Sequence, residues 1–251
     1  MPTFKSFDGL ELHYEDTGDG PPTVLLHGFA ADSELNWERP GVAAALLDAG
    51  RRLIMLDARG HGRSEKPHEP AAYENDAMAA DVSALADELD LDLFDVVGYS
   101  MGGRTTALVS GREPRVRSAV MGGVGAAAFA RGSAMRSAVA DALVAEDPRS
   151  ATGDETAQGF RVFADSTGAD RLALAAVMRA GSTLTNEHLA AITVPVLIVT
   201  GTEDDLVGDP APLADQIADA RVVRCPGDHL TAPSQPEFRA AVAAFLADQD
   251  D

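Results

Sequence analysis

Ser100 is the side chain of this sequence best placed to act as a nucleophile. It stands in the pattern Gly98-x-Ser100-x-Gly102, directly after an apolar run and before a helix-compatible stretch. A tight turn from strand to helix pushes a serine hydroxyl clear of the backbone, and the two glycines lack the Cβ atoms that would clash there. The helix that follows points free N–H groups at the same spot. The pattern therefore predicts an exposed hydroxyl at a helix start.

Three further groups with reactive side chains also follow strand-like apolar runs. They are His27-Gly28-Phe29, the acidic turn Gly201-Thr202-Glu203-Asp204-Asp205, and His229. Functional residues of a parallel sheet gather just beyond the carboxyl ends of its strands, so we expect these groups near Ser100. The chain order of serine, acid and histidine is the order expected when a nucleophilic serine stands on such a turn.

The elements that must position these groups are visible in the hydrophobic pattern. Two short β-type runs flank the turn dipeptide Asp8-Gly9 and predict an antiparallel pair. Strands and helices then alternate, which indicates a parallel sheet covered by helices on both faces. The expected strands are 23–26, 53–56, 93–97, 116–121, 194–200 and 221–225, and the expected helices include 42–49, 76–91, 212–220 and a C-terminal helix capped by Ser234.

Residues 122–188 break this alternation. They hold helix-like pieces at 134–145, 156–164 and 171–180, but no apolar strand run. We interpret the segment as a helical cap inserted into a core formed by residues 1–121 and 189–251. Its apolar residues could line a pocket, although their helical spacing favours simple packing: Phe160, Phe163, Val177 and Met178.

The composition narrows the classes of partner and cofactor. Forty acidic against twenty basic residues give a net charge of −20, which repels phosphate backbones and anionic lipid surfaces. We therefore expect neither a nucleic acid nor a membrane partner. The first residues lack the layout of a secretion signal and no long apolar run occurs, so we expect a cytoplasmic protein. No metal-ligand spacing is present, and we expect neither metal nor cofactor.

Four motifs carry a resemblance to the α/β-hydrolase fold superfamily. They are His27-Gly28-Phe29, Asp57-x-Arg59-Gly60-His61-Gly62-x-Ser64, Gly98-Tyr99-Ser100-Met101-Gly102-Gly103 and Gly201-x-x-Asp204, with Asp228-His229 near the end. They stand in the family's order, and the resemblance covers nearly all of the chain outside 122–188. The first half is also similar to cofactor-free bacterial haloperoxidases, which are esterases. The resemblance implies an α/β fold with a mostly parallel eight-stranded sheet, helices on both faces and a small helical cap.

The resemblance also implies a role for individual residues. Ser100 is the implied nucleophile and His229 the general base, since a hydroxyl reacts poorly at neutral pH unless an imidazole takes its proton. Asp204 matches the position of the acid that orients this histidine, and Asp205 is the alternative. The implied oxyanion hole consists of the backbone N–H groups of Phe29 and Met101. The expected substrate-binding residues are Trp37, Tyr99, Val207 and Leu230.

The other polar residues of these motifs are interpreted as structural. We expect His27 and His61 to organise the loops that follow their strands, rather than to transfer protons. Asp57 and Arg59 are expected to brace their turn as a partly buried ion pair.

Together these residues imply a serine esterase that acts on a small-molecule ester through an acyl-enzyme intermediate. The short insertion and the acidic surface favour small to medium, uncharged acyl groups. Lactonase, thioesterase and carbon–carbon bond hydrolase activities use the same three residue types and remain alternatives. So does a small-molecule receptor of the same fold with slow turnover. We expect a monomer or a homodimer.

Overall fold

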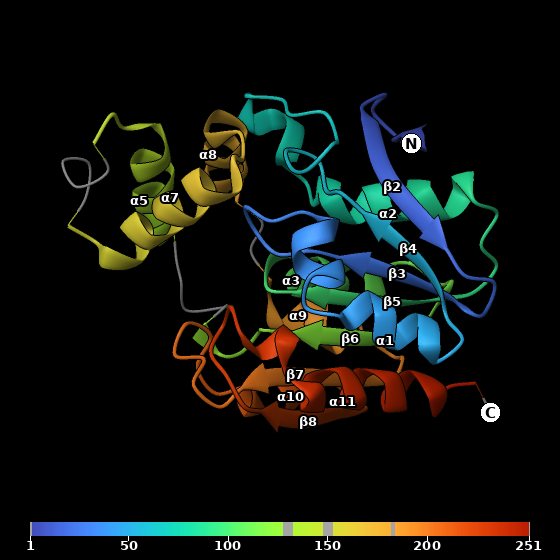
Figure 1. The fold of residues 1–251 in the computed structure, drawn as a ribbon. Helices are drawn as coiled ribbons and strands as arrows, with labels where there is room; N and C mark the ends of the chain where they lie inside the picture. The colour runs from blue at the N-terminus through green and yellow to red at the C-terminus, as the bar shows by residue number, and fades with distance from the viewer. Residues whose placement is uncertain (1, 128–132, 148–152, 182–183, 251) are drawn as a thin grey trace.

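An eight-stranded sheet forms the centre of the computed structural model, which describes residues 2–127, 133–147, 153–181 and 184–250 (Figure 1). The strand order is β1-β2-β4-β3-β5-β6-β7-β8. β2 pairs antiparallel with β1 and β4, and the other neighbours pair in parallel. The predicted hairpin and the mostly parallel sheet are thus confirmed. The strands are β1 Thr3–Lys5, β2 Glu11–Thr17, β3 Pro22–Leu26, β4 Arg52–Leu56, β5 Phe94–Tyr99, β6 Val116–Gly122, β7 Val196–Gly201 and β8 Ala220–Cys225.

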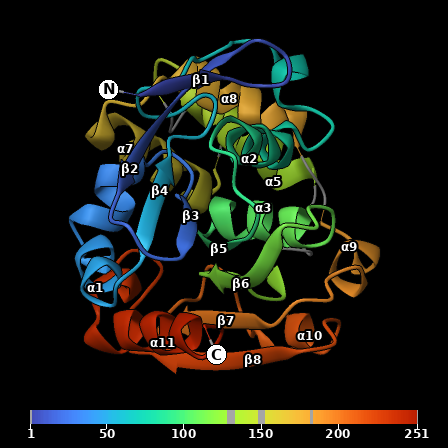
Figure 2. The ribbon, with the colours of Figure 1, turned by 90° about the vertical axis from the view of Figure 1, so that its right-hand side faces the viewer.

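Helices cover both faces of this sheet (Figure 2). α1 (Val42–Asp48) and α11 (Pro236–Ala247) pack on one face, in a core cluster that includes Leu25 and Leu53. The opposite face carries α2 Ala77–Glu88, α3 Met101–Ser110, α9 Asn186–Ala190 and α10 Ala211–Ala214. Every residue of β5 is buried, as expected of a strand covered on both sides.

Three further helices form a separate group at one end of the molecule (Figure 1). They are α5 (Ser133–Val144), α7 (Glu155–Thr167) and α8 (Arg171–Ala180), and their bounds closely match the expected helical pieces. We call these three helices the cap, without implying a separate domain. Their own apolar cluster also takes in Phe29 and Ala30, which follow β3. The helices therefore lie over a strand end that carries a candidate functional loop. The division of the chain into core and cap stays a prediction, and parts of residues 122–188 lie outside the described residues.

Two local expectations are wrong. α10 has only four residues, Ala211–Ala214, and three of them fall within the predicted helix at 212–220. Ser234 does not cap the C-terminal helix, because it ends the short 3-10 turn Ala232–Ser234, and Gln235 occupies the N-cap position instead. Pro236 opens the helix, since its fixed φ and missing N–H suit the first helical position.

Candidate active site

The backbone around Ser100 is a sharp turn between β5 and α3. Ser100 has φ 55° and ψ −108°, a conformation that side-chain-bearing residues rarely adopt. A Cβ atom at Gly98 would collide with the carbonyl oxygen of Gly102, and one at Gly102 would collide with that of Leu26. The N–H of Ser100 donates to the carbonyl of Gly122 at 2.8 Å. The strained turn is therefore held from two neighbouring strands.

Ser100, His229 and Asp204 form one hydrogen-bonded row. His229 Nε2 lies 2.9 Å from Ser100 Oγ, and His229 Nδ1 lies 2.8 Å from Asp204 Oδ2. A carboxylate only accepts hydrogen bonds, so Nδ1 carries the imidazole proton and Nε2 is left to accept the hydroxyl proton of Ser100. The Asp204 side chain is fully buried and that of His229 is 15% exposed. The row is thus sheltered at its acid end and open at its serine end.

The two acidic neighbours of Asp204 lie elsewhere. Glu203 and Asp205 are both exposed, whereas Asp204 points inward from the end of β7 to His229. Of the two alternatives left by the sequence, the structure brings Asp204 to the histidine.

The loop that carries His229 is fixed on both sides of the histidine. The hydroxyl of Tyr99 donates to the His229 carbonyl at 2.8 Å, and the two rings lie 5.4 Å apart. Burial raises the pKa of Tyr99, so its hydroxyl keeps the proton that it donates. On the other side, Asp228 accepts from the N–H groups of Leu230 and Thr231. The Thr231 hydroxyl holds the pKa of the Asp228 carboxyl below its usual value. These bonds orient the imidazole.

A second loop, after β3, faces Ser100 from the neighbouring strand. The N–H of Gly28 donates to Asn36 Oδ1 at 2.8 Å. His27 Nδ1 donates to the Gly28 carbonyl, and His27 Nε2 accepts from the N–H of Ala58. A neutral imidazole therefore spans two strand ends. This agrees with a role of His27 in holding the loop backbone.

The two N–H groups expected to receive an oxyanion lie in this region. That of Phe29 has no acceptor among the described residues. That of Met101 belongs to the first turn of α3, where helix N–H groups lack an intrahelical acceptor. Both donors are available to a ligand bound beside Ser100.

Comparison with known proteins identifies this arrangement. A family model for the alpha/beta hydrolase fold matches residues 21–143. A hydrolase from Pseudomonas aeruginosa PA01 superposes with a TM-score of 0.81 at 26% identity, covering 98% of this chain and 97% of the other. The chain has the α/β-hydrolase fold. The resemblance seen in its motifs is thereby confirmed.

Other proteins that are similar to this chain span several activities. A thermophilic esterase from Thermogutta terrifontis superposes with a TM-score of 0.78 at 25% identity, covering 100% of this chain and 99% of the other. A non-heme chloroperoxidase of Kitasatospora aureofaciens is 38% identical over 123 residues, which are 48% of this chain and 43% of that protein. An enol-lactonase and a 2-hydroxy-6-oxo-2,4-heptadienoate hydrolase are also similar. The chain thus matches less than half the length of its curated relatives.

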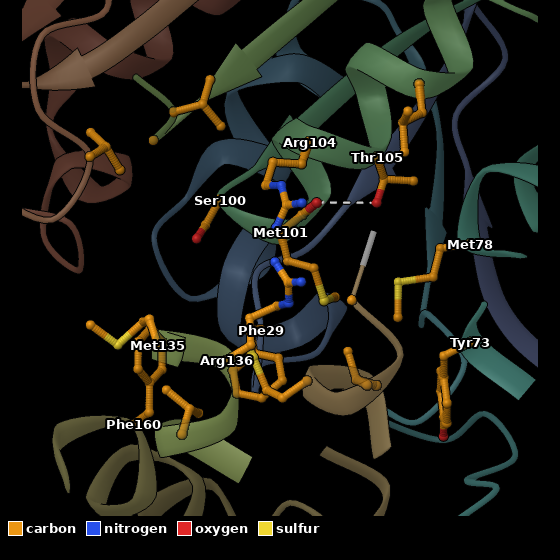
Figure 3. Close-up of a pocket in the computed structure, with 18 of the residues that line it drawn as sticks. Phe29, Tyr73, Met78, Ser100, Met101, Arg104, Thr105, Met135, Arg136 and Phe160 are labelled. Atoms are coloured by element: carbon orange, nitrogen blue, oxygen red, sulfur yellow. Dashed lines mark hydrogen bonds between the residues drawn. The ribbon is translucent and has the colours of Figure 1, made fainter. Parts of the chain in front are cut away.

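Two cavities of the structure meet at Ser100 and His229. The smaller has a volume of about 190 Å³ and the larger about 470 Å³. Val207 lines the smaller cavity, while Tyr99 and Leu230 line the larger. Phe29 and Phe160 border both cavities, and Figure 3 shows the smaller one, with Phe160 reaching toward it from the cap.

Trp37 does not lie where the sequence analysis placed it. It lines neither cavity, is fully buried, and packs with the core cluster of α1 and α11. The helical turn Glu34–Glu38 turns Asn36 toward the Gly28 loop, and its next side chain consequently points into the core.

The apolar residues of the cap do more than pack. Phe160, Val177 and Met178 line the smaller cavity, and Phe163 lines the larger. The same four also pack against the cap cluster. Helical spacing alone cannot separate the two roles, because a shallow cavity exposes one side of a packed side chain.

Asp57 and Arg59 do not pair with each other. Asp57 accepts from the N–H groups of Ser33 and Arg63, whereas Arg59 binds Asp81 at 2.6 Å. Asp57 is held by backbone donors of the loops around it, whereas Arg59 reaches to Asp81 on α2, so each residue has its own partner. His61 is 1% exposed and organises this turn by donating to the Arg59 carbonyl. Burial lowers its pKa to about 3.

Two arginines that were not expected from the sequence, Arg104 and Arg136, line the smaller cavity. Arg104 stands one helical turn after Ser100, so the i, i+4 relation could have placed it on the same side. Nothing in the sequence singles out Arg136, which reaches the site only through the position of the cap. Among the described residues, no cluster of three His, Cys, Asp or Glu side chains could hold a metal ion.

Proposed function

We propose that this α/β hydrolase cleaves carboxylic esters of small to medium acyl groups through an acyl-enzyme on Ser100. The observation that carries the proposal is the row of hydrogen bonds from Ser100 through His229 to the buried Asp204. It supplies a hydroxyl, a base in the correct tautomer and a fixed acid, at a point where two cavities meet.

Acylation begins when Ser100 Oγ attacks the ester carbonyl and His229 Nε2 takes the hydroxyl proton. The imidazolium that forms keeps its Nδ1 proton on Asp204, whose negative charge stabilises it. The carbonyl oxygen becomes an oxyanion and accepts from the N–H groups of Phe29 and Met101. Removing one such donor costs about 2.7–4 kcal/mol of transition-state stabilisation in enzymes of this kind.

Collapse of the tetrahedral intermediate releases the alcohol, which leaves with the proton from His229 Nε2. Water then enters, loses a proton to the same nitrogen and attacks the acyl-enzyme carbonyl. The second tetrahedral intermediate expels Ser100 Oγ, which regains the proton. The products are the alcohol and the carboxylic acid, and the enzyme returns to its starting state.

The chain is also similar to a lactonase, a chloroperoxidase and a carbon–carbon bond hydrolase. The reactions of these proteins are therefore alternatives for the site at Ser100. A thioesterase would use the same row, with a thiol as the leaving group. A receptor with slow turnover is the alternative outside enzyme catalysis.

Steady-state turnover of p-nitrophenyl acetate and butyrate tests the proposal. We expect multiple turnovers by the wild type and only the background rate with Ser100→Ala. A single stoichiometric burst without further turnover would favour a receptor, and equal rates for the two proteins would contradict the role of Ser100. Parallel assays with lactones and thioesters of matched acyl length compare the alternatives.

A further inference from the structure

The two cavities that meet at Ser100 differ in charge. The described residues that line the larger cavity include no Asp, Glu, Lys or Arg. Those that line the smaller one include Arg104, Arg136 and Asp76. The smaller cavity therefore carries a net charge of +1 if His229 is neutral, inside a protein whose net charge is −20. The charge of the cavity is thus opposite in sign to that of the whole protein.

The two arginines reach the cavity from different parts of the fold. Arg104 comes from α3, directly behind the nucleophile, and Arg136 comes from α5 of the cap. Figure 3 shows both guanidinium groups directed into the space beside Met101. Arg136 also lies against Gly181, where an added Cβ atom would collide with its guanidinium group. Arg136 is thus held at the cavity from the cap side.

The acidic residue of this cavity has a partner outside it, whereas Arg136 has no ion-pair partner among the described residues. Asp76 forms an ion pair at 2.6 Å with Arg112, which does not line the cavity. Within the described residues, the side chain of Arg136 makes no hydrogen bond or ion pair. The proximity of Arg136 contributes, after burial, to a lowered pKa of Arg104. Two guanidinium groups that repel each other in a partly buried space are stabilised by an anion between them.

We propose that the smaller cavity binds a carboxylate of the substrate through Arg136 and Arg104. This inference rests on the proposed esterase function and names its substrate class. The substrate is an ester with one carboxylate on one side of the scissile bond and an uncharged, apolar group on the other. A single negative charge matches the net charge of the cavity, and planar guanidinium groups bind carboxylates in a forked geometry.

The carboxylate can belong to the acyl or to the alcohol part, and two substrate series separate these sources. The first series consists of monoethyl esters of succinic, glutaric and adipic acid. The second consists of butyrate esters of short ω-hydroxy acids. Each ester is compared with a neutral analogue in which a methyl group replaces the carboxylate. We expect kcat/KM for one anionic series to exceed that of its neutral analogue by at least 10-fold.

Arg136→Met tests the site itself, because methionine keeps an unbranched apolar stem without the charge. We expect the ratio of kcat/KM values, anionic over neutral, to fall by about 10- to 100-fold, as for the loss of a hydrogen bond to a charged group. Arg179→Met is the matched control, since Arg179 lies on α8 of the cap but lines neither cavity. We expect it to keep the wild-type ratio.

Calorimetry with Ser100→Ala separates this inference from the proposed function. We expect glutarate or adipate to bind Ser100→Ala and to lose that binding in Ser100→Ala with Arg136→Met. Such binding without any ester turnover would support the anion site and contradict the esterase proposal. Turnover of neutral and anionic esters at similar kcat/KM by the wild type, with no dicarboxylate binding, would overturn the anion site and leave the esterase proposal standing.

Discussion

At the scale of single residues, the function proposed for this protein depends on which nitrogen of His229 carries the proton. Asp204 fixes that choice because its carboxylate accepts from Nδ1 at 2.8 Å. An asparagine in its place can donate through its amide, which favours the opposite tautomer with the proton on Nε2. His229 could then no longer accept the proton of Ser100.

We therefore expect Asp204→Asn to lower kcat by about 10³–10⁴-fold, the size of effect known for the wrong tautomer in such rows. The measurement is steady-state hydrolysis of p-nitrophenyl butyrate. Asp205→Asn is the matched control, since Asp205 is exposed and adjacent in sequence. Comparable losses in the two variants would contradict the assignment of Asp204.

At the scale of elements, the helical turn Glu34–Glu38 holds the loop that carries one oxyanion donor. Asn36 accepts the N–H of Gly28, the residue immediately before Phe29. We expect Asn36→Ala to lower kcat by about 10-fold, because the lost hydrogen bond is worth about 0.5–1.5 kcal/mol and the donor is displaced. Glu34→Ala on the same turn removes only a surface ion pair and serves as the control. Equal activity of the two variants would show that the loop needs no such support.

Hydrogen bonds join two helices of the cap, α5 and α7. Arg161 of α7 donates to the carbonyls of Ala142, Leu143 and Ala145 at the end of α5. We expect Arg161→Ala to reduce the free energy of local opening of the cap by about 1–3 kcal/mol, because these buried acceptors lose a charged donor.

Hydrogen exchange of the α5 and α7 backbone amides measures this effect. Arg171→Ala is the control, since Arg171 is only partly buried and lies 3.7 Å from its carboxylate partner. Protection that stays at the wild-type level in Arg161→Ala, or falls only in the central sheet, would contradict the claim that Arg161 stabilises α5 and α7.

At the scale of the whole molecule, buried histidine links folding to pH. Burial lowers the pKa of His61 to about 3 in the folded protein, from an ordinary value of 6.5. Between these values the unfolded chain binds a proton at His61 that the folded protein does not bind. Acid therefore favours unfolding across this window, and the contribution vanishes above it.

Within this window, we expect the contribution of His61 to lower the free energy of unfolding by up to about 1.4 kcal/mol for each unit by which the pH falls. His61→Asn removes the titrating group and keeps a donor for the Arg59 carbonyl. Urea unfolding at pH 4.5, 5.5 and 6.5 should give a shallower pH dependence for the variant. An unchanged slope would show that His61 is protonated in the folded protein.

The sequence predicted the sheet and the reactive row because both depend on local patterns. Apolar runs identify strands buried on both faces, and residues directly after such runs share one edge of the sheet. Ser100, Asp204 and His229 could thus be placed together although 129 residues separate Ser100 from His229.

The lining of the site could not be predicted in the same way, because it depends on how distant elements pack. Trp37 and Asn36 are neighbours in sequence, yet one enters the core and the other supports the loop beside Ser100. Arg136 lines the cavity beside Ser100 only because α5 lies over the carboxyl ends of the strands. The periodicity of apolar residues predicts which face of a helix is apolar, but it does not predict which part of the protein that face packs against.

Labelling of Ser100 by a fluorophosphonate tests the central claim most directly. The reagent bonds covalently only to a serine whose hydroxyl is activated, and intact mass with peptide mapping locates the adduct. We expect one adduct per wild-type chain, on Ser100, and none on Ser100→Ala. An unlabelled wild type, or an adduct of equal yield on Ser100→Ala, would contradict the claim that His229 and Asp204 activate this serine.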